Sequence, residues 1–203
     1  MDNEPVPAWE KAPTFIQFTL QEYAARGALL QPMIAVFPAA KYAADNNGAA
    51  QSVQRLRALI STPGRALNNG SVPFVPFFNA TQTFIAQAKP LKFQDGVGVR
   101  MLTQYDQAPI PINNHELIYH FEGLTNDGQF YVIAVLPITS LNLPADGKLD
   151  SAVPAGGVPF NSANPQAYFD AITNRLNSVA PDAFSPSISS LDSLIGSINL
   201  SIP

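Results

Sequence analysis

The feature that most constrains the fold is a pair of β-forming runs separated by a tight turn. The runs cover residues 116–122 (ELIYHFE) and 129–137 (QFYVIAVLP), and Asp127-Gly128 lies between them. Asp-Gly is a preferred dipeptide in the short turns of β-hairpins, because these turns need positive φ. Both faces of the two runs carry apolar residues, which require cover on both sides of a sheet. The sequence therefore predicts an antiparallel hairpin at the centre of an α+β domain.

A second turn of the same kind extends this hairpin into a larger sheet. Asp95-Gly96 separates residues 90–93 from residues 97–105, whose side chains alternate between two strand faces. The two hairpins together predict a meander of at least four antiparallel strands. Two more short strands are expected at 14–20 and 32–38.

Three segments have apolar residues at helical spacing. They are residues 45–61, with Asp45, Asn46 or Asn47 as the N-cap, 165–180, which follow Asn164, and 187–198, which begin at a serine. We expect the first two helices to cover the central antiparallel sheet and the last to pack at an edge. The predicted architecture is a sandwich of the α/β/α kind.

The domain organisation follows from proline and glycine content. Residues 1–13 contain three prolines and a cluster of charges, and we expect them to form a flexible tether. Residues 14–203 are long enough for one α+β domain with a sizeable core. Residues 137–165 hold several prolines and glycines with little periodicity, so a long loop is expected there.

Composition limits the classes of partner and the cellular compartments that are expected for this chain. The net charge is −4 with only 11 Lys and Arg, so nothing favours binding to nucleic acid. Charged residues make up 13% of the chain, against roughly 25% in ordinary soluble domains. Such a surface favours an extracytoplasmic location, secreted or lipid-anchored, with a leader removed and a possible membrane tether. A cytoplasmic protein with an uncharged surface is the alternative.

The chain has no cysteine, which excludes disulfides, thiolate metal sites and a cysteine nucleophile. His115 and His120 would point to opposite faces of one extended strand, so a two-histidine metal site is not expected. We expect neither a bound metal nor a cofactor.

One row of polar residues offers a candidate for acid–base chemistry. Glu116, His120 and Glu122 fall on one face of the predicted strand, where carboxylates could raise the histidine pKa. A hydrolase or lyase could use this row with Arg100 as an anion clamp. A half-exposed strand face with ordinary polar decoration gives the same pattern, and we favour that interpretation.

A run of aromatic residues that is broken by two prolines offers a different kind of site. Phe74, Phe77 and Phe78 could form a docking surface if they were exposed together, which would make the chain a structural or assembly component. Burial of these rings in a packed loop is the alternative.

Three segments carry a resemblance to known proteins: residues 93–105 (FQDGVGVRMLTQY), 112–119 (INNHELIY) and 123–132 (GLTNDGQFYV). Over roughly the central 100 residues the chain resembles a group of uncharacterised bacterial secreted proteins and lipoproteins. In its order of elements it also resembles the α/β/α sandwich of the PsbP and Mog1 families. The first resemblance implies export. The second implies a binding or accessory role, by analogy of fold.

These observations together predict an extracytoplasmic binding or accessory module without intrinsic catalysis. Its partner would be an unknown protein or a small-molecule ligand.

Overall fold

The computed structural model describes residues 7, 11–23, 27–62, 64, 67–68, 71–73 and 79–200. Its centre is a six-stranded antiparallel sheet, and helices pack on both faces. The predicted α+β class is confirmed.

The main sheet contains both predicted hairpins. Its strands, in spatial order, are β1 (Ile16–Thr19), β2 (Met33–Pro38), β8 (Phe130–Pro137), β7 (Ile118–Thr125), β5 (Gly96–Thr103) and β4 (Ala86–Phe93). Four short strands form two separate pairs: β3 (Thr81–Gln82) with β6 (Tyr105–Asp106), and β9 (Thr139–Ser140) with β10 (Phe184–Ser185).

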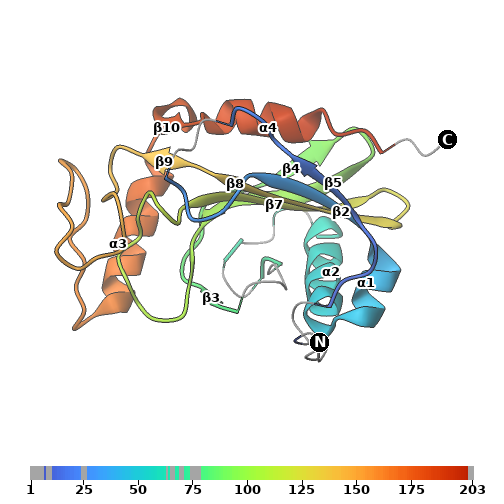
Figure 1. Cartoon of the computed structure of the whole chain (residues 1–203), viewed down its shortest axis with the longest axis horizontal. Coiled ribbons are helices and arrows are strands. Elements are labelled where there is room, and N and C mark those ends of the chain that lie inside the picture. Colours follow the sequence, from blue (N-terminus) through green and yellow to red (C-terminus); the bar gives the residue numbers. More distant parts are fainter. Residues whose placement is uncertain are drawn as a thin grey trace, which may run out of the picture.

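The helices form two layers (Figure 1). Their bounds are α1 (Ala39–Asp45), α2 (Asn47–Ile60), α3 (Pro165–Asn177) and α4 (Ile188–Gly196), and a 3₁₀ turn, η1 (Pro181–Ala183), precedes β10. Figure 1 shows α4 over one face of the sheet, α1 and α2 under the other, and α3 at one end. The last helix thus lies across a face, from which it also contacts the edge strand β4.

Side-chain caps fix the starts of three helices. Asn46 accepts a hydrogen bond from the Ala49 amide (3.1 Å), and Asn164 accepts one from the Ala167 amide (3.2 Å). Ser187 does the same for Ser190 at the start of α4 (3.1 Å). Each cap satisfies an amide that has no partner within the helix. The predicted helix starts are confirmed at these residues.

The β7–β8 hairpin has the register that a tight turn imposes. His120 lies opposite Val135 and Glu122 opposite Ile133. These four side chains therefore lie on the sheet face that packs against α1 and α2. The register decides which polar side chains can meet, because a slip of one residue would move each of them to the other face.

Gly98 allows β5 to pack closely against β7. A Cβ at this position would lie 2.2 Å from the Glu122 carbonyl oxygen and 2.6 Å from the Phe121 ring. The sequence Gly96-Val-Gly98, at the start of β5, therefore serves the close packing of this strand against β7.

Residues 141–164 contain no helix or strand and form the long loop, drawn in orange in Figure 1. Leu143 is buried, and Phe160 packs edge-on against Tyr168 with ring centroids 4.9 Å apart. The loop is thus tied to the core through α3. Among the described helices, none has the length and apolar character needed to cross a membrane.

Candidate functional site

His120 and Glu122 form a buried pair in the middle of the sheet. Both side chains are 0% exposed, and His120 Nε2 lies 2.7 Å from Glu122 Oε1. The Tyr131 hydroxyl on β8 donates a hydrogen bond to Glu122 Oε2. The expectation of a half-exposed polar face is wrong here, because β7 is an inner strand and α2 covers this face.

Burial dominates the electrostatics of the pair. It raises the pKa of Glu122, while the hydrogen bond and charge of His120 act in the opposite direction. Tyr42 on α1 has its pKa raised by its own burial and then by the charge of Glu122. His120 Nδ1 has no hydrogen-bond partner among the described residues. The arrangement can hold one shared proton between acid and imidazole, inside the core.

Glu116 does not join this pair. It lies in a turn before β7 begins at Ile118, and its Oε2 accepts a hydrogen bond from Asn113 Nδ2 at 2.7 Å. Glu116 lies in a turn because the side-chain oxygen of Asn113 accepts hydrogen bonds from the backbone amides of His115 (3.0 Å) and Glu116 (3.2 Å). Such an Asx turn ends the strand pattern that the sequence indicated.

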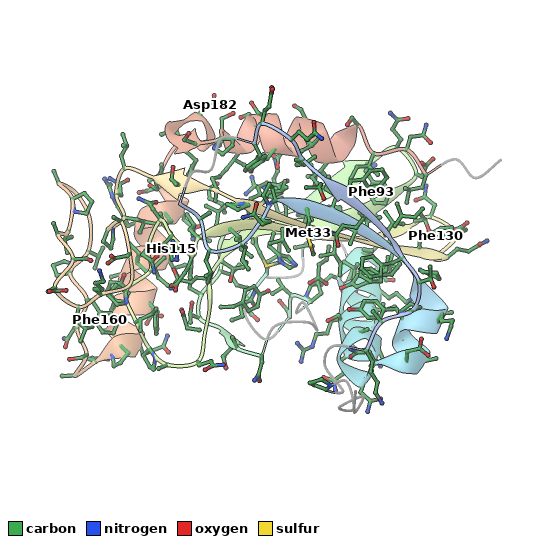
Figure 2. All side chains as sticks on the ribbon, viewed as in Figure 1. Met33, Phe93, His115, Phe130, Phe160 and Asp182 are labelled. Atoms are coloured by element: carbon green, nitrogen blue, oxygen red, sulfur yellow. The ribbon has the colours of Figure 1, made fainter. Side chains whose placement is uncertain are left out.

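His115 lies apart from the buried pair as well. Its Nδ1 contacts the Gly27 carbonyl, and Figure 2 shows it at the end of the sheet near α3, opposite the end that holds Phe130. The two histidines therefore belong to different regions.

Glu116 belongs instead to a polar network beyond the ends of β5 and β7. Gln104 Nε2 donates to Asp106 Oδ2 (2.8 Å), and Gln104 Oε1 accepts from the Asn113 amide (3.0 Å). Burial raises the pKa of Asp106 to about 6, and the charge of Glu116 adds to the effect, while the hydrogen bond from Gln104 opposes it. This network is not predicted from the sequence, where its only signal is a run of amides and acids after a strand.

Arg100 lies on the opposite face of the sheet from His120. Its register partner is Phe121, and its side chain is 4% exposed beneath α4. Arg100 Nε forms an ion pair with Asp192 Oδ1 (3.2 Å), and Nη1 donates to the Gln87 carbonyl. Arg100 is therefore not brought together with the His120–Glu122 pair, and its guanidinium is already paired with an acid of the same chain.

Asp192 gathers two further partners. Lys89 Nζ lies 2.7 Å from its Oδ2, and the Tyr119 hydroxyl donates to its Oδ1 at 2.9 Å. Asp192 is the one acid within α4, and this isolation on an apolar helix is the signal that could have identified it.

Four of the surface cavities formed by the described residues have volumes of 370–510 Å³, and none of these four is lined by His120, Glu122 or Arg100. One is a groove of about 480 Å³ between the end of α2 and the β4–β5 hairpin. Its walls are mainly apolar and include Leu59, Ile60, Pro90, Val97 and Val99. We call this cavity the α2 groove.

No group of three or more His, Asp or Glu side chains within the described ranges could hold a metal ion. Phe74, Phe77 and Phe78, the predicted docking residues, lie outside the described residues. Comparisons with protein-family models, with curated proteins and with solved structures found no match to this chain.

Proposed function

We propose that the chain is a binding or accessory module that acts outside the cytoplasm and has no catalytic reaction of its own. The observation that carries the proposal is the position of the candidate acid–base residues. His120 and Glu122 are fully buried and contact each other at 2.7 Å, and Arg100 is paired with Asp192 on the other face.

A general acid or base must come within hydrogen-bond reach of its substrate. His120 and Glu122 are 0% exposed and do not line the four cavities described above. A substrate could reach them only if the helices separated from the sheet. The buried pair is therefore better explained as part of the core.

The α2 groove supports the binding half of the proposal. Ligand sites are usually concave and apolar, with a few polar groups at the rim, and the groove has this character. Lys92 and Asn126 are among the polar residues that line it. The volume of about 480 Å³ falls within the range of small-molecule sites.

The low proportion of charged residues and the proline-containing N-terminal segment support an extracytoplasmic, tethered protein. Fractionation of the producing cells checks this part directly. Recovery of the native protein with the envelope or the medium is expected, and recovery in the cytoplasm would reject it.

Catalysis is tested with a panel of chromogenic esters and glycosides. We expect the wild type to match the buffer blank. Turnover that is lost in Glu122→Gln and kept in Glu116→Gln would overturn the proposal, since the two substitutions make the same chemical change at a buried and at a partly exposed position.

Binding is tested with the apolar anion 8-anilinonaphthalene-1-sulfonate and the Val97→Trp variant. Val97 is partly exposed in the groove, so an indole at this position fills the cavity without displacing a buried core residue. We expect the probe to bind the wild type and to lose at least tenfold in affinity in Val97→Trp. Leu141→Trp, at an exposed residue outside the groove, is the matched control.

A further inference from the structure

The outer edge of β1 is open and apolar. All four residues of the strand are exposed, and its large apolar side chains keep much of their surface: Ile16 61% and Phe18 51%. Phe15, just before the strand, is 39% exposed. β1 pairs with β2 on one side, and no other described strand pairs with it. An edge of this kind offers unpaired backbone donors and acceptors to another strand.

The opposite edge of the same sheet is protected. Lys89, Pro90 and Lys92 are exposed along β4, and Gln87 has φ of 53° at an irregularity in the β4–β5 pairing. The Gln87 amide donates to Asn177 Oδ1 of α3, not to a strand. Charged residues, proline and irregular backbone are the usual means of preventing strand addition, and β1 has none of them.

The absence of charge at β1 indicates which partner fits. Residues 12–20 contain no Asp, Glu, Lys, Arg or His. In a twofold antiparallel contact, only the residue at the axis meets its own copy, and every other residue lies opposite the residue equally far on the other side of the axis. Around Gln17 the strand is complementary to itself, because its two large apolar residues, Ile16 and Phe18, would lie opposite each other and no charge would be left without an opposite partner.

We propose that two copies of this chain pair through β1 in antiparallel orientation around a twofold axis normal to the sheet. In the register centred on Gln17, each Ile16 lies opposite Phe18 of the second copy on the face that carries Ile34 and Val36. Aliphatic–aromatic pairs of this kind stabilise antiparallel sheets. The two Gln17 amides meet at the axis, where each can both donate and accept a hydrogen bond.

The protected β4 edge makes this assembly a closed one. Pairing at β1 joins two six-stranded sheets into one, whose two outer edges are both β4. Because β4 resists further addition, the product is a dimer and not a fibre.

The first test is the mass in solution, measured by light scattering after size exclusion over a wide concentration range. We expect the wild type to approach twice 21.8 kDa as its concentration rises. Phe18→Lys places a charge on the edge and is expected to remain monomeric with an unchanged circular dichroism spectrum. Leu141→Lys alters a residue that is 87% exposed elsewhere, and this variant is expected to dimerise like the wild type.

The second test uses the absence of cysteine. Gln17→Cys would place one thiol of each copy at the axis, at a separation suited to a disulfide, and oxidation is expected to give a cross-linked dimer. Lys89→Cys, on the protected edge, is the control and is expected to give no cross-linked dimer on oxidation.

A wild type that is monomeric at every concentration overturns the proposal, as does a Phe18→Lys variant that still dimerises. Equal cross-linking of Gln17→Cys and Lys89→Cys overturns it too. None of these results depends on the ligand of the α2 groove, so the dimer and the proposed binding function fail or hold independently.

Discussion

His120 and Glu122 are ionisable side chains with no exposed surface, joined by a contact of 2.7 Å. Burial of an ionisable group costs free energy, which a paired group offsets. His120 Nε2 and Glu122 Oε1 form such a pair, while His120 Nδ1 has no hydrogen-bond partner among the described residues. Tyr131 adds a third group from the neighbouring strand. At the residue scale, the pair is a part of the core, and we expect removal of either side chain to lower the stability of the fold.

His120→Ala is expected to lower the free energy of unfolding by roughly 3 kcal/mol, because the acid is left buried without its partner. Urea denaturation followed by circular dichroism measures the change. His115→Ala is the control, expected to cost about 1 kcal/mol or less for one hydrogen bond at a less buried site. Equal losses in the two variants would contradict the role assigned to His120.

The raised pKa of Asp106 predicts that the stability of the protein depends on pH. Burial raises its pKa from 3.8 to about 6 in the folded protein, so between these values the folded state holds a proton that the unfolded chain has released. Its contribution to stability is therefore complete below pH 3.8 and is lost as the pH rises to about 6.

Asp106→Asn should accordingly be more stable than the wild type at pH 7, by up to about 3 kcal/mol, from about 1.4 kcal/mol per pH unit between the two pKa values. At pH 4 the difference should nearly vanish. Urea titrations at both pH values test this, and Asp182→Asn, at an exposed carboxylate, should show no such change. Glu122, whose pKa burial also raises, is present in all three proteins and cancels from the comparison.

At the scale of elements, the polar contacts between α4 and the sheet are made through one acid, Asp192. Asp192 receives Arg100 and Tyr119 from β5 and β7 and Lys89 from β4. Arg100 is nearly fully buried, whereas the Lys89 side chain is 49% exposed. The two cations should therefore contribute very differently to the attachment of α4.

Asp192→Ala is expected to destabilise the protein by roughly 3 kcal/mol, since it leaves the Arg100 guanidinium buried without an acid. Lys89→Ala should cost less than about 1 kcal/mol, as exposed ion pairs do. Hydrogen exchange adds a local measurement: α4 amides should lose protection in Asp192→Ala and keep it in Lys89→Ala. Identical exchange in both variants would reject Asp192 as the fastening residue.

The elements that sequence predicts well are those with local signals. Both hairpins carry Asp-Gly turns, and α2, α3 and α4 begin at capping side chains. By contrast, α1 is missed because a seven-residue helix directly after β2 is too short to show a period. Glu116 is misplaced for a similar reason, since the turn made by Asn113 interrupts a continuous strand pattern.

The candidate site is less predictable than the fold because its contacts join distant segments. Arg100 and Asp192 are 92 positions apart, and only the packing of α4 brings them together. The face that Arg100 occupies relative to His120 depends on the β5–β7 register, which no local motif specifies. Burial of Glu122 likewise depends on α2, which lies far earlier in the chain.

At the scale of the whole molecule, the sheet is shared by two apolar layers. Ile118 faces the layer of α1 and α2, while its neighbour Tyr119 faces the layer of α3 and α4. Adjacent residues of β7 pack into both layers. We therefore expect that one layer cannot unfold while the other layer stays folded.

We therefore expect α2 and α3 to unfold in a single transition. Hydrogen exchange by mass spectrometry across a urea series should give peptides of both helices the same midpoint. Separate midpoints would show that the two layers are independent units.

The account rests most directly on His120 being closed to solvent, and diethyl pyrocarbonate modification followed by peptide mass spectrometry measures this. In the native protein, His115 should be modified readily while His120 stays protected, and urea should make both reactive. Modification of His120 at the rate of His115 in the native protein would contradict the account, because it would place an accessible imidazole beside Glu122.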